Sequence, residues 1–149
     1  MPAPAARTVL SFDYGLRRIG VAAGNTLTGT AEALATVAAK DGAPDWRALD
    51  ALVADWRPDE MVVGVPYNER AGGLAAAALR FADELGRRYG VGIHRVDERL
   101  SSREAEDGLR ERRRSGAKTR RVRRGDVDRE AARLLLLQWL RARPGADAR

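Results

Sequence analysis

The sequence contains no cysteine and only one histidine, and these absences remove several kinds of active site. Without cysteine the chain cannot form a disulfide, a cysteine-ligated zinc site or a thiolate nucleophile. Because His94 is the only imidazole, a Ser-His-Asp triad could be built only around this residue, and a metal site with two histidines is excluded. These exclusions direct attention to the carboxylates.

Long hydrophobic runs are also missing. No stretch approaches the 18 consecutive apolar residues that a membrane-spanning helix would need. Residues 1–7 are rich in alanine and proline and lack the apolar core of a secretory signal, so we expect a cytoplasmic protein that does not associate with a membrane. The 149 residues correspond to a single domain, for which we predict flexible tails at 1–7 and 142–149.

Aromatic residues make up only 5% of the chain, and none lies in its most basic segment, residues 110–124. This segment contains nine lysines and arginines and one acid, a local charge of +8, whereas the net charge of the whole chain is +6. The remainder is therefore slightly acidic. Such a segment favours a nucleic acid partner that is held through its phosphates rather than by base stacking. A solvated loop without a ligand is the alternative interpretation.

The hydrophobic pattern predicts alternating strands and helices. Five apolar runs are typical of strands: 9–12, 19–23, 31–37, 61–65 and 91–96. Helices are predicted at 45–57, at 74–89 with Gly90 as its cap, after the Ser101–Glu104 capping box, and from about Val127 onward. Three antiparallel strands followed by alternating helices and strands indicate an α/β fold with a mixed sheet.

Three acids occupy positions that suit catalysis. Asp13 ends the first predicted strand and Glu98 follows the last, so both should lie at the carboxyl ends of strands, where open α/β sheets place their sites. Asp128 shares a helix face with Ala132 and Leu135, the face that should pack on the sheet. Three converging carboxylates repel one another unless a cation joins them, and oxygen ligands suit Mg²⁺ or Mn²⁺. Two such ions can activate a water and stabilise the leaving oxygen in phosphodiester cleavage.

Each acid also has an ordinary structural interpretation. Asp13 could cap the following turn, and Glu98 could pair with neighbouring arginines while Asp97 serves as the ligand in its place. Asp128 could simply complement the helix dipole, with Asp126 as the N-cap. Only the combination of the three acids favours catalysis.

The motifs around these acids together resemble the YqgF (RuvX) family. They are DYG at 13–15 with RIGVA at 18–22, GVPYN at 64–68, DERLSS at 97–102, and VD at 127–128 before an apolar helix. The resemblance runs from about Thr8 to Leu140, with the motifs in the family's order and spacing. Members have a ribonuclease H-like fold and are described as Holliday-junction resolvases or pre-16S rRNA nucleases. The resemblance implies a mixed five-stranded sheet with helices on both faces.

The same resemblance implies site residues. Asp13, Glu98 and Asp128 correspond to the family's catalytic acids, which would hold Mg²⁺ or Mn²⁺. The chain departs from the family in two places: the loop at 68–72 reads NERAG instead of Asn-x-x-Gly-Ser/Thr, and Arg129 replaces a small residue. Contacts to nucleic acid are predicted for Arg17, Arg18, Asn68, Arg99, Arg112, Arg113, Arg114, Lys118, Arg120, Arg121, Arg123 and Arg124.

These observations predict a hydrolase, a metal-dependent endonuclease that acts in the 5′-end maturation of pre-16S rRNA. We expect a monomer or homodimer whose partner is structured RNA rather than branched DNA, with Holliday-junction resolution as the enzymatic alternative. A non-catalytic nucleic-acid-binding factor in transcription or ribosome assembly would need the basic segment but not the acids. An ATP-binding protein of the same fold is disfavoured by the small size and the absence of a second domain.

Overall fold

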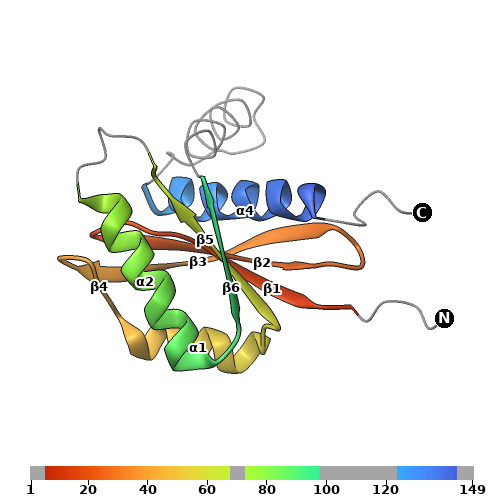
Figure 1. The fold of residues 1–149 in the computed structure, drawn as a ribbon, viewed down its shortest axis with the longest axis horizontal. Helices are drawn as coiled ribbons and strands as arrows, with labels where there is room; N and C mark the ends of the chain where they lie inside the picture. Colours follow the sequence, from red (N-terminus) through yellow and green to blue (C-terminus); the bar gives the residue numbers. More distant parts are fainter. Residues whose placement is uncertain (1–5, 68–72, 98–123, 144–149) are drawn as a thin grey trace.

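The computed structural model describes residues 6–67, 73–97 and 124–143, which form a six-stranded mixed sheet with helices on both faces (Figure 1). The elements are β1 (Thr8–Asp13), β2 (Arg18–Asn25), β3 (Thr30–Lys40), β4 (Ala43–Pro44), α1 (Trp46–Trp56), β5 (Glu60–Val65), α2 (Leu74–Tyr89), β6 (Gly92–Asp97) and α4 (Arg124–Ala142). The strand order is β4-β3-β2-β1-β5-β6. The strands from β1 to β4 pair antiparallel, and β1, β5 and β6 run parallel. The predicted α/β architecture is therefore confirmed.

The sheet contains one strand more than the five predicted. The additional strand, β4, comprises only Ala43 and Pro44, which pair with Lys40 and Ala39 at the edge of the sheet. A strand of two residues shows no alternation in the sequence, and its proline is tolerated because an edge strand leaves one side unpaired. None of the helices in the described ranges is both long and apolar enough to cross a membrane.

Two predicted helices begin and end where the sequence indicates. The carboxylate of Asp45 accepts a hydrogen bond from the Ala48 amide at the start of α1, and Arg57 caps its end in the left-handed region. Gly90 caps α2 with a φ of 68° and donates its amide to the Gly86 carbonyl, as predicted.

The last helix, α4, begins at Arg124, three residues before the predicted start at Val127. The Thr36 hydroxyl donates to the Gly125 carbonyl at 2.8 Å, which holds this glycine in the first helical turn despite its low helix propensity. Asp126 consequently lies in the first turn, buried, and not before the helix as an N-cap. The helix predicted after Ser101 and most of the predicted tails, 1–7 and 142–149, lie outside the described residues.

The two faces of the sheet carry separate cores. Strands β1 and β5 send Leu10, Phe12, Met61 and Val63 toward α1 and α2, and their alternate residues, such as Val9 and Val62, toward α4. On the second face α4 contributes Ala132, Leu135, Leu136 and Leu140, all almost fully buried. The predicted packing face of this helix is therefore confirmed.

Strand β2 has large side chains on one face and glycines on the other, and the glycine face allows α4 to pack close to the sheet. Ile19 and Val21 fill the core beneath α1 and α2, whereas the alternate residues Gly20 and Gly24 face α4. A Cβ atom on Gly20 would lie 1.9 Å from the backbone oxygen of Asp128, and one on Gly24 would lie 2.8 Å from a methyl group of Leu136. Helix α4 thus rests directly on the β2 backbone.

Replacing Gly20 with alanine should destabilise the protein by about 3 kcal/mol, because the new methyl group meets backbone that cannot move without displacing α4. The measurement is chemical denaturation followed by circular dichroism. The matched control is Gly92→Ala on β6, where a Cβ would meet no atom within 4 Å and the backbone has ordinary angles. The control should be neutral or slightly more stable. Equal stability of the two variants would contradict the close approach of α4.

Candidate active site

Asp13 lies at the carboxyl end of β1, on the face of the sheet that α4 covers. Val9, on the same face, belongs to the core beneath α4, and Ser11, two residues further on, donates its hydroxyl to the Ala132 carbonyl at 2.7 Å. Because side chains alternate along a strand, Asp13 continues this row. It is half-buried, at the point where the row meets the edge of the sheet.

Asp128 comes to the same place through the first turns of α4. Gly20, on which the Asp128 backbone rests, is the residue paired with Asp13 in the β1–β2 ladder. The two acids, at opposite ends of the sequence, consequently line one hollow of about 360 Å³. The prediction that strand end and helix face would bring these acids together agrees with this geometry.

The turn between β1 and β2 forms the rest of the hollow, which is lined by Tyr14, Gly15, Leu16, Arg17, Arg18 and Leu74 besides the two acids. The turn is tight, since a Cβ on Gly15 would lie 2.6 Å from the Arg18 carbonyl oxygen. Two backbone amides hold the turn in place. The amide of Ala39, in β3, donates to the Arg17 carbonyl, and the amide of Gly42, after β3, donates to the Leu16 carbonyl, both at 2.9 Å. The hollow thus has a rigid rim on this side.

Arg18 forms an ion pair with Asp128 inside the hollow. Its Nε donates to Oδ2 of Asp128 at 2.8 Å, and the two side chains are 36% and 21% exposed. Sequence reasoning proposed Arg18 as a phosphate ligand and missed this pairing, for which the sequence carries no signal because the partners are far apart in the chain. Arg18 also lines the hollow, which is open to solvent, and Asp128 takes only one of its donor nitrogens.

Arg129, one of the departures from the family pattern, anchors the start of α4. Its guanidinium pairs with the buried Asp126 and donates to the Thr36 hydroxyl at 3.2 Å, while Thr36 itself donates to the Gly125 carbonyl. The start of α4 is thereby attached to Thr36 of β3 by two hydrogen bonds, and the ion pair with Asp126 holds Arg129 within the helix. Arg129 therefore stabilises the helix segment that carries Asp128.

The phenol of Tyr14 connects the β1–β2 turn to the turn between β3 and β4. Its hydroxyl donates to the Gly42 carbonyl at 2.6 Å, and Gly42 has a φ of 87°, which only glycine adopts at little cost. Burial raises the pKa of Tyr14, although the positive charge of Arg80 opposes the rise. The phenol therefore stays protonated and keeps its role as donor at neutral pH.

The donor chemistry of the hollow fits a hard divalent cation. Asp13 and Asp128 supply carboxylate oxygens only, which suits Mg²⁺ or Mn²⁺. Within the described ranges no cluster of three acidic, histidine or cysteine side chains is present, and the predicted third ligand, Glu98, lies outside them. Its rival Asp97 is the exposed last residue of β6, a strand that runs parallel to β1 and β5 and ends at the same edge.

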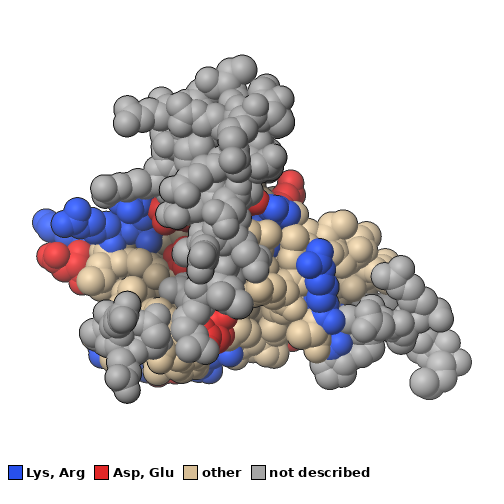
Figure 2. Space-filling model, turned by 90° about the horizontal axis from the view of Figure 1, so that it is seen from above, with Lys and Arg blue, Asp and Glu red and all other residues tan. Residues whose placement is uncertain are grey.

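The other predicted contacts to nucleic acid fall outside what the structure describes: Asn68, Arg99, Arg112, Arg113, Arg114, Lys118, Arg120, Arg121 and Arg123, and the side chain of Arg124. Arg17 and Arg18 are the members of the predicted set whose side chains are described, and both line the hollow. On the described surface seen from above, basic and acidic side chains lie close to one another and do not form one large patch of a single sign (Figure 2).

The only histidine of the chain takes no part in this site. Nε2 of His94 lies 2.8 Å from Oε1 of Glu60, the first residue of β5, and its ring packs on Trp139 with the centroids 4.9 Å apart. Glu60 belongs to the amino end of β5, whereas Asp13 lies at a carboxyl end. A histidine-based mechanism at this site is thus excluded.

Comparison with known families assigns the chain to one of them. The model of the RuvX family, described as Holliday junction resolvase, matches residues 7–142. The chain belongs to the RuvX family. A relative from Marinobacter nauticus is 43% identical over an alignment of 147 residues that covers 97% of this chain and all of the relative. Another, from Azotobacter vinelandii, is 45% identical over 93% of this chain and 96% of the relative. Both are named as predicted pre-16S rRNA nucleases.

Solved structures with the same fold are resolvases of low sequence identity. RuvC from T. thermophilus, solved in complex with a Holliday junction substrate, superposes with a TM-score of 0.56 at 18% identity and covers 94% of this chain and 97% of its own. The yeast mitochondrial Holliday junction resolvase gives a TM-score of 0.51 at 11% identity, over 89% of this chain and 77% of its own. The RuvX-family chain therefore has the ribonuclease H-like fold.

Proposed function

We propose that this RuvX-family protein is a metal-dependent endonuclease that cleaves phosphodiester bonds in the 5′-end maturation of pre-16S rRNA. The observation that carries the proposal is the shared hollow of Asp13 and Asp128 at the carboxyl edge of the parallel strands. The names of the relatives at 43% and 45% identity support rRNA as the substrate, and bacterial rRNA processing would place the activity in the cytoplasm.

Asp13 and Asp128, together with Glu98, would hold the Mg²⁺ or Mn²⁺ ion. A bound ion would supply Lewis-acid chemistry at the phosphate and would favour deprotonation of the attacking water. Gly20 and the Thr36–Arg129 anchor hold the Asp128 backbone on the residue that pairs with Asp13, which fixes where the carboxylate of Asp128 begins. Arg17 and Arg18 would donate to phosphate oxygens at the rim.

The family description also names a second substrate, the Holliday junction. Resolving a four-way junction requires two active sites and hence a dimer. The first experiment can test cleavage of the junction alongside cleavage of the RNA. A labelled precursor of the 16S rRNA 5′ end and a labelled four-way DNA junction should be incubated with Mg²⁺, with Mn²⁺ and with EDTA. Cleavage of the RNA alone, abolished by EDTA, is the result that the proposal predicts.

Replacing Asp13 with asparagine should lower the cleavage rate at least about 100-fold and leave nucleic acid affinity unchanged or slightly higher, because a carboxylate ligand is lost but no basic contact is. The matched control is Asp55→Asn, an exposed acid of α1, which should cleave at the wild-type rate. If Asp13→Asn cleaves normally, the site is misassigned. If the wild-type protein binds both substrates but cleaves neither, the non-catalytic binding factor is the better description.

Replacing Arg18 with glutamine should raise the affinity for Mn²⁺ by about two- to fivefold, since it removes a fixed positive charge that shares the Asp128 carboxylate. Isothermal titration calorimetry measures this affinity without any cleavage. Arg17→Gln, in the same hollow, is the control and should change the affinity less. A weaker affinity in Arg18→Gln would mean that Arg18 serves mainly to orient Asp128 as a ligand.

A further inference from the structure

Arg18 stands in the hollow between the two groups that the proposed reaction brings together, a divalent cation and a phosphate. Its Nε donates to Oδ2 of Asp128 at 2.8 Å, and both side chains line the hollow together with Asp13 and Arg17. The pair is in contact with solvent, since 36% of the Arg18 side chain and 21% of the Asp128 side chain are exposed. Ion pairs that solvent reaches contribute little to stability, so this one can be exchanged for other partners.

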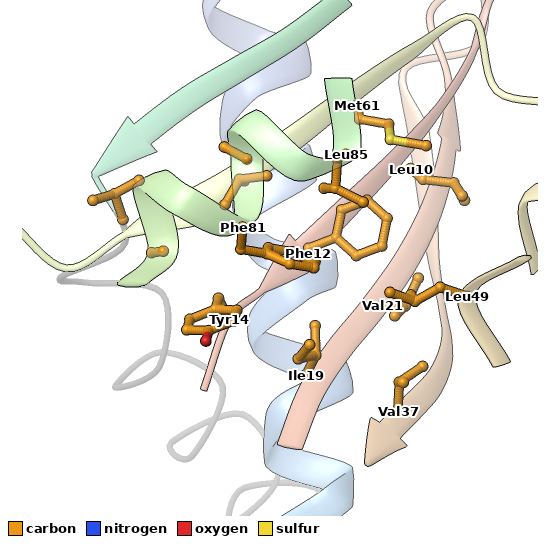
Figure 3. Packing of buried hydrophobic residues seen from close by; sticks show 14 of the residues in the cluster. Leu10, Phe12, Tyr14, Ile19, Val21, Val37, Leu49, Met61, Phe81 and Leu85 are labelled. Carbon is orange, nitrogen blue, oxygen red and sulfur yellow. The ribbon is translucent and has the colours of Figure 1, made fainter. Parts of the chain in front are cut away.

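The backbone that carries Arg18 is held in place, so an exchange of partners needs movement of the side chain alone. Ile19, the next residue of β2, is fully buried beneath α1 and α2, and Figure 3 shows it among the residues of that core. The carbonyl of Arg17 accepts the Ala39 amide at 2.9 Å. Because side chains alternate along a strand, Arg18 points to the same side as Gly20, which α4 covers.

On the acid, Arg18 competes with a cation. Oδ2 of Asp128 already accepts the hydrogen bond from Arg18, and the positive charge of that guanidinium opposes the approach of Mg²⁺ or Mn²⁺. Binding of an ion by Asp13 and Asp128 would therefore weaken the pair and release the Arg18 side chain.

On the guanidinium, Asp128 competes with a phosphate. Arginine grips phosphate best through two parallel N–H donors, and one donor of Arg18, Nε, is held by Asp128. When Arg18 turns to a phosphate, it therefore leaves Asp128, and the carboxylate regains its full negative charge for the cation.

We propose that Arg18 couples the two ligands of this site, so that a divalent cation and a nucleic acid phosphate each strengthen the binding of the other. The inference rests on the proposed function and adds a form of regulation to it. Either ligand alone must break the Arg18–Asp128 pair, whereas both together break it only once. By thermodynamic linkage the two effects are equal in size. A partly exposed pair corresponds to a factor of about two to five in affinity.

The test measures RNA affinity by fluorescence anisotropy with and without saturating Ca²⁺, a cation that also takes oxygen ligands. The RNA is the labelled precursor of the 16S rRNA 5′ end, and gels confirm that it stays intact. Ca²⁺ should strengthen RNA binding by the wild-type protein, and this strengthening should be about two- to fivefold smaller in Arg18→Gln. Effects of Ca²⁺ on the RNA itself cancel in the comparison. Without RNA, calorimetry should show that Arg18→Gln binds Ca²⁺ more tightly by the same factor.

Arg17→Gln is the matched control, because Arg17 lines the same hollow with the same charge, whereas Arg18 is the donor to Asp128. This control should weaken RNA binding equally with and without Ca²⁺. Equal strengthening by Ca²⁺ in the wild type and in Arg18→Gln, both with wild-type melting temperatures, would overturn the proposal. Weaker Ca²⁺ binding by Arg18→Gln would overturn it too, since Arg18 would then only position Asp128. Failure of the wild-type protein to bind the RNA or the cation would instead overturn the proposed function itself.

Discussion

The close approach of α4 to β2 at Gly20 is the contact on which the site depends. With no side chain between them, the Asp128 backbone sits on the residue that pairs with Asp13, so the geometry of the ladder sets the separation of the two acids. A larger residue would lift the helix by the thickness of a side chain. The site is therefore built from backbone packing, and the side chains that carry its chemistry follow from it.

The two faces of the sheet have different tasks at its carboxyl edge. On one face, Ser11, Thr36 and Arg129 attach α4 to β1 and β3 and so present the acids. On the other, the hydrogen bond from the Tyr14 hydroxyl to the Gly42 carbonyl holds the turn after β1. The end of β1 thus contributes to both faces: Asp13 lines the hollow beside α4, and Tyr14 packs into the core beneath α1 and α2.

The elements with long periodic patterns could be predicted from the sequence, as could the positions of Asp13 and Asp128. The stripe of Ala132 and Leu135 on α4 and the apolar run of β1 report burial directly, and the acids stand in register with them. The two-residue β4 and the early start of α4 could not be predicted, because each depends on a tertiary partner. Strand β4 depends on its pairing with β3, and the start of α4 depends on Thr36. The small residues Gly20 and Gly24, alternating with large ones, were a readable signal for the close helix that the prediction did not use.

If Asp13 and Asp128 act together, they should hold one divalent cation between them in the hollow. Crystals grown with Mn²⁺ and measured near the manganese absorption edge would test it most directly, since the anomalous difference map locates the ion independently of activity. We expect a peak in the hollow within coordination distance of both carboxylates, and we expect this peak to be lost in Asp13→Asn. A well-diffracting wild-type crystal with Mn²⁺ bound elsewhere, and none at these two acids, would contradict it.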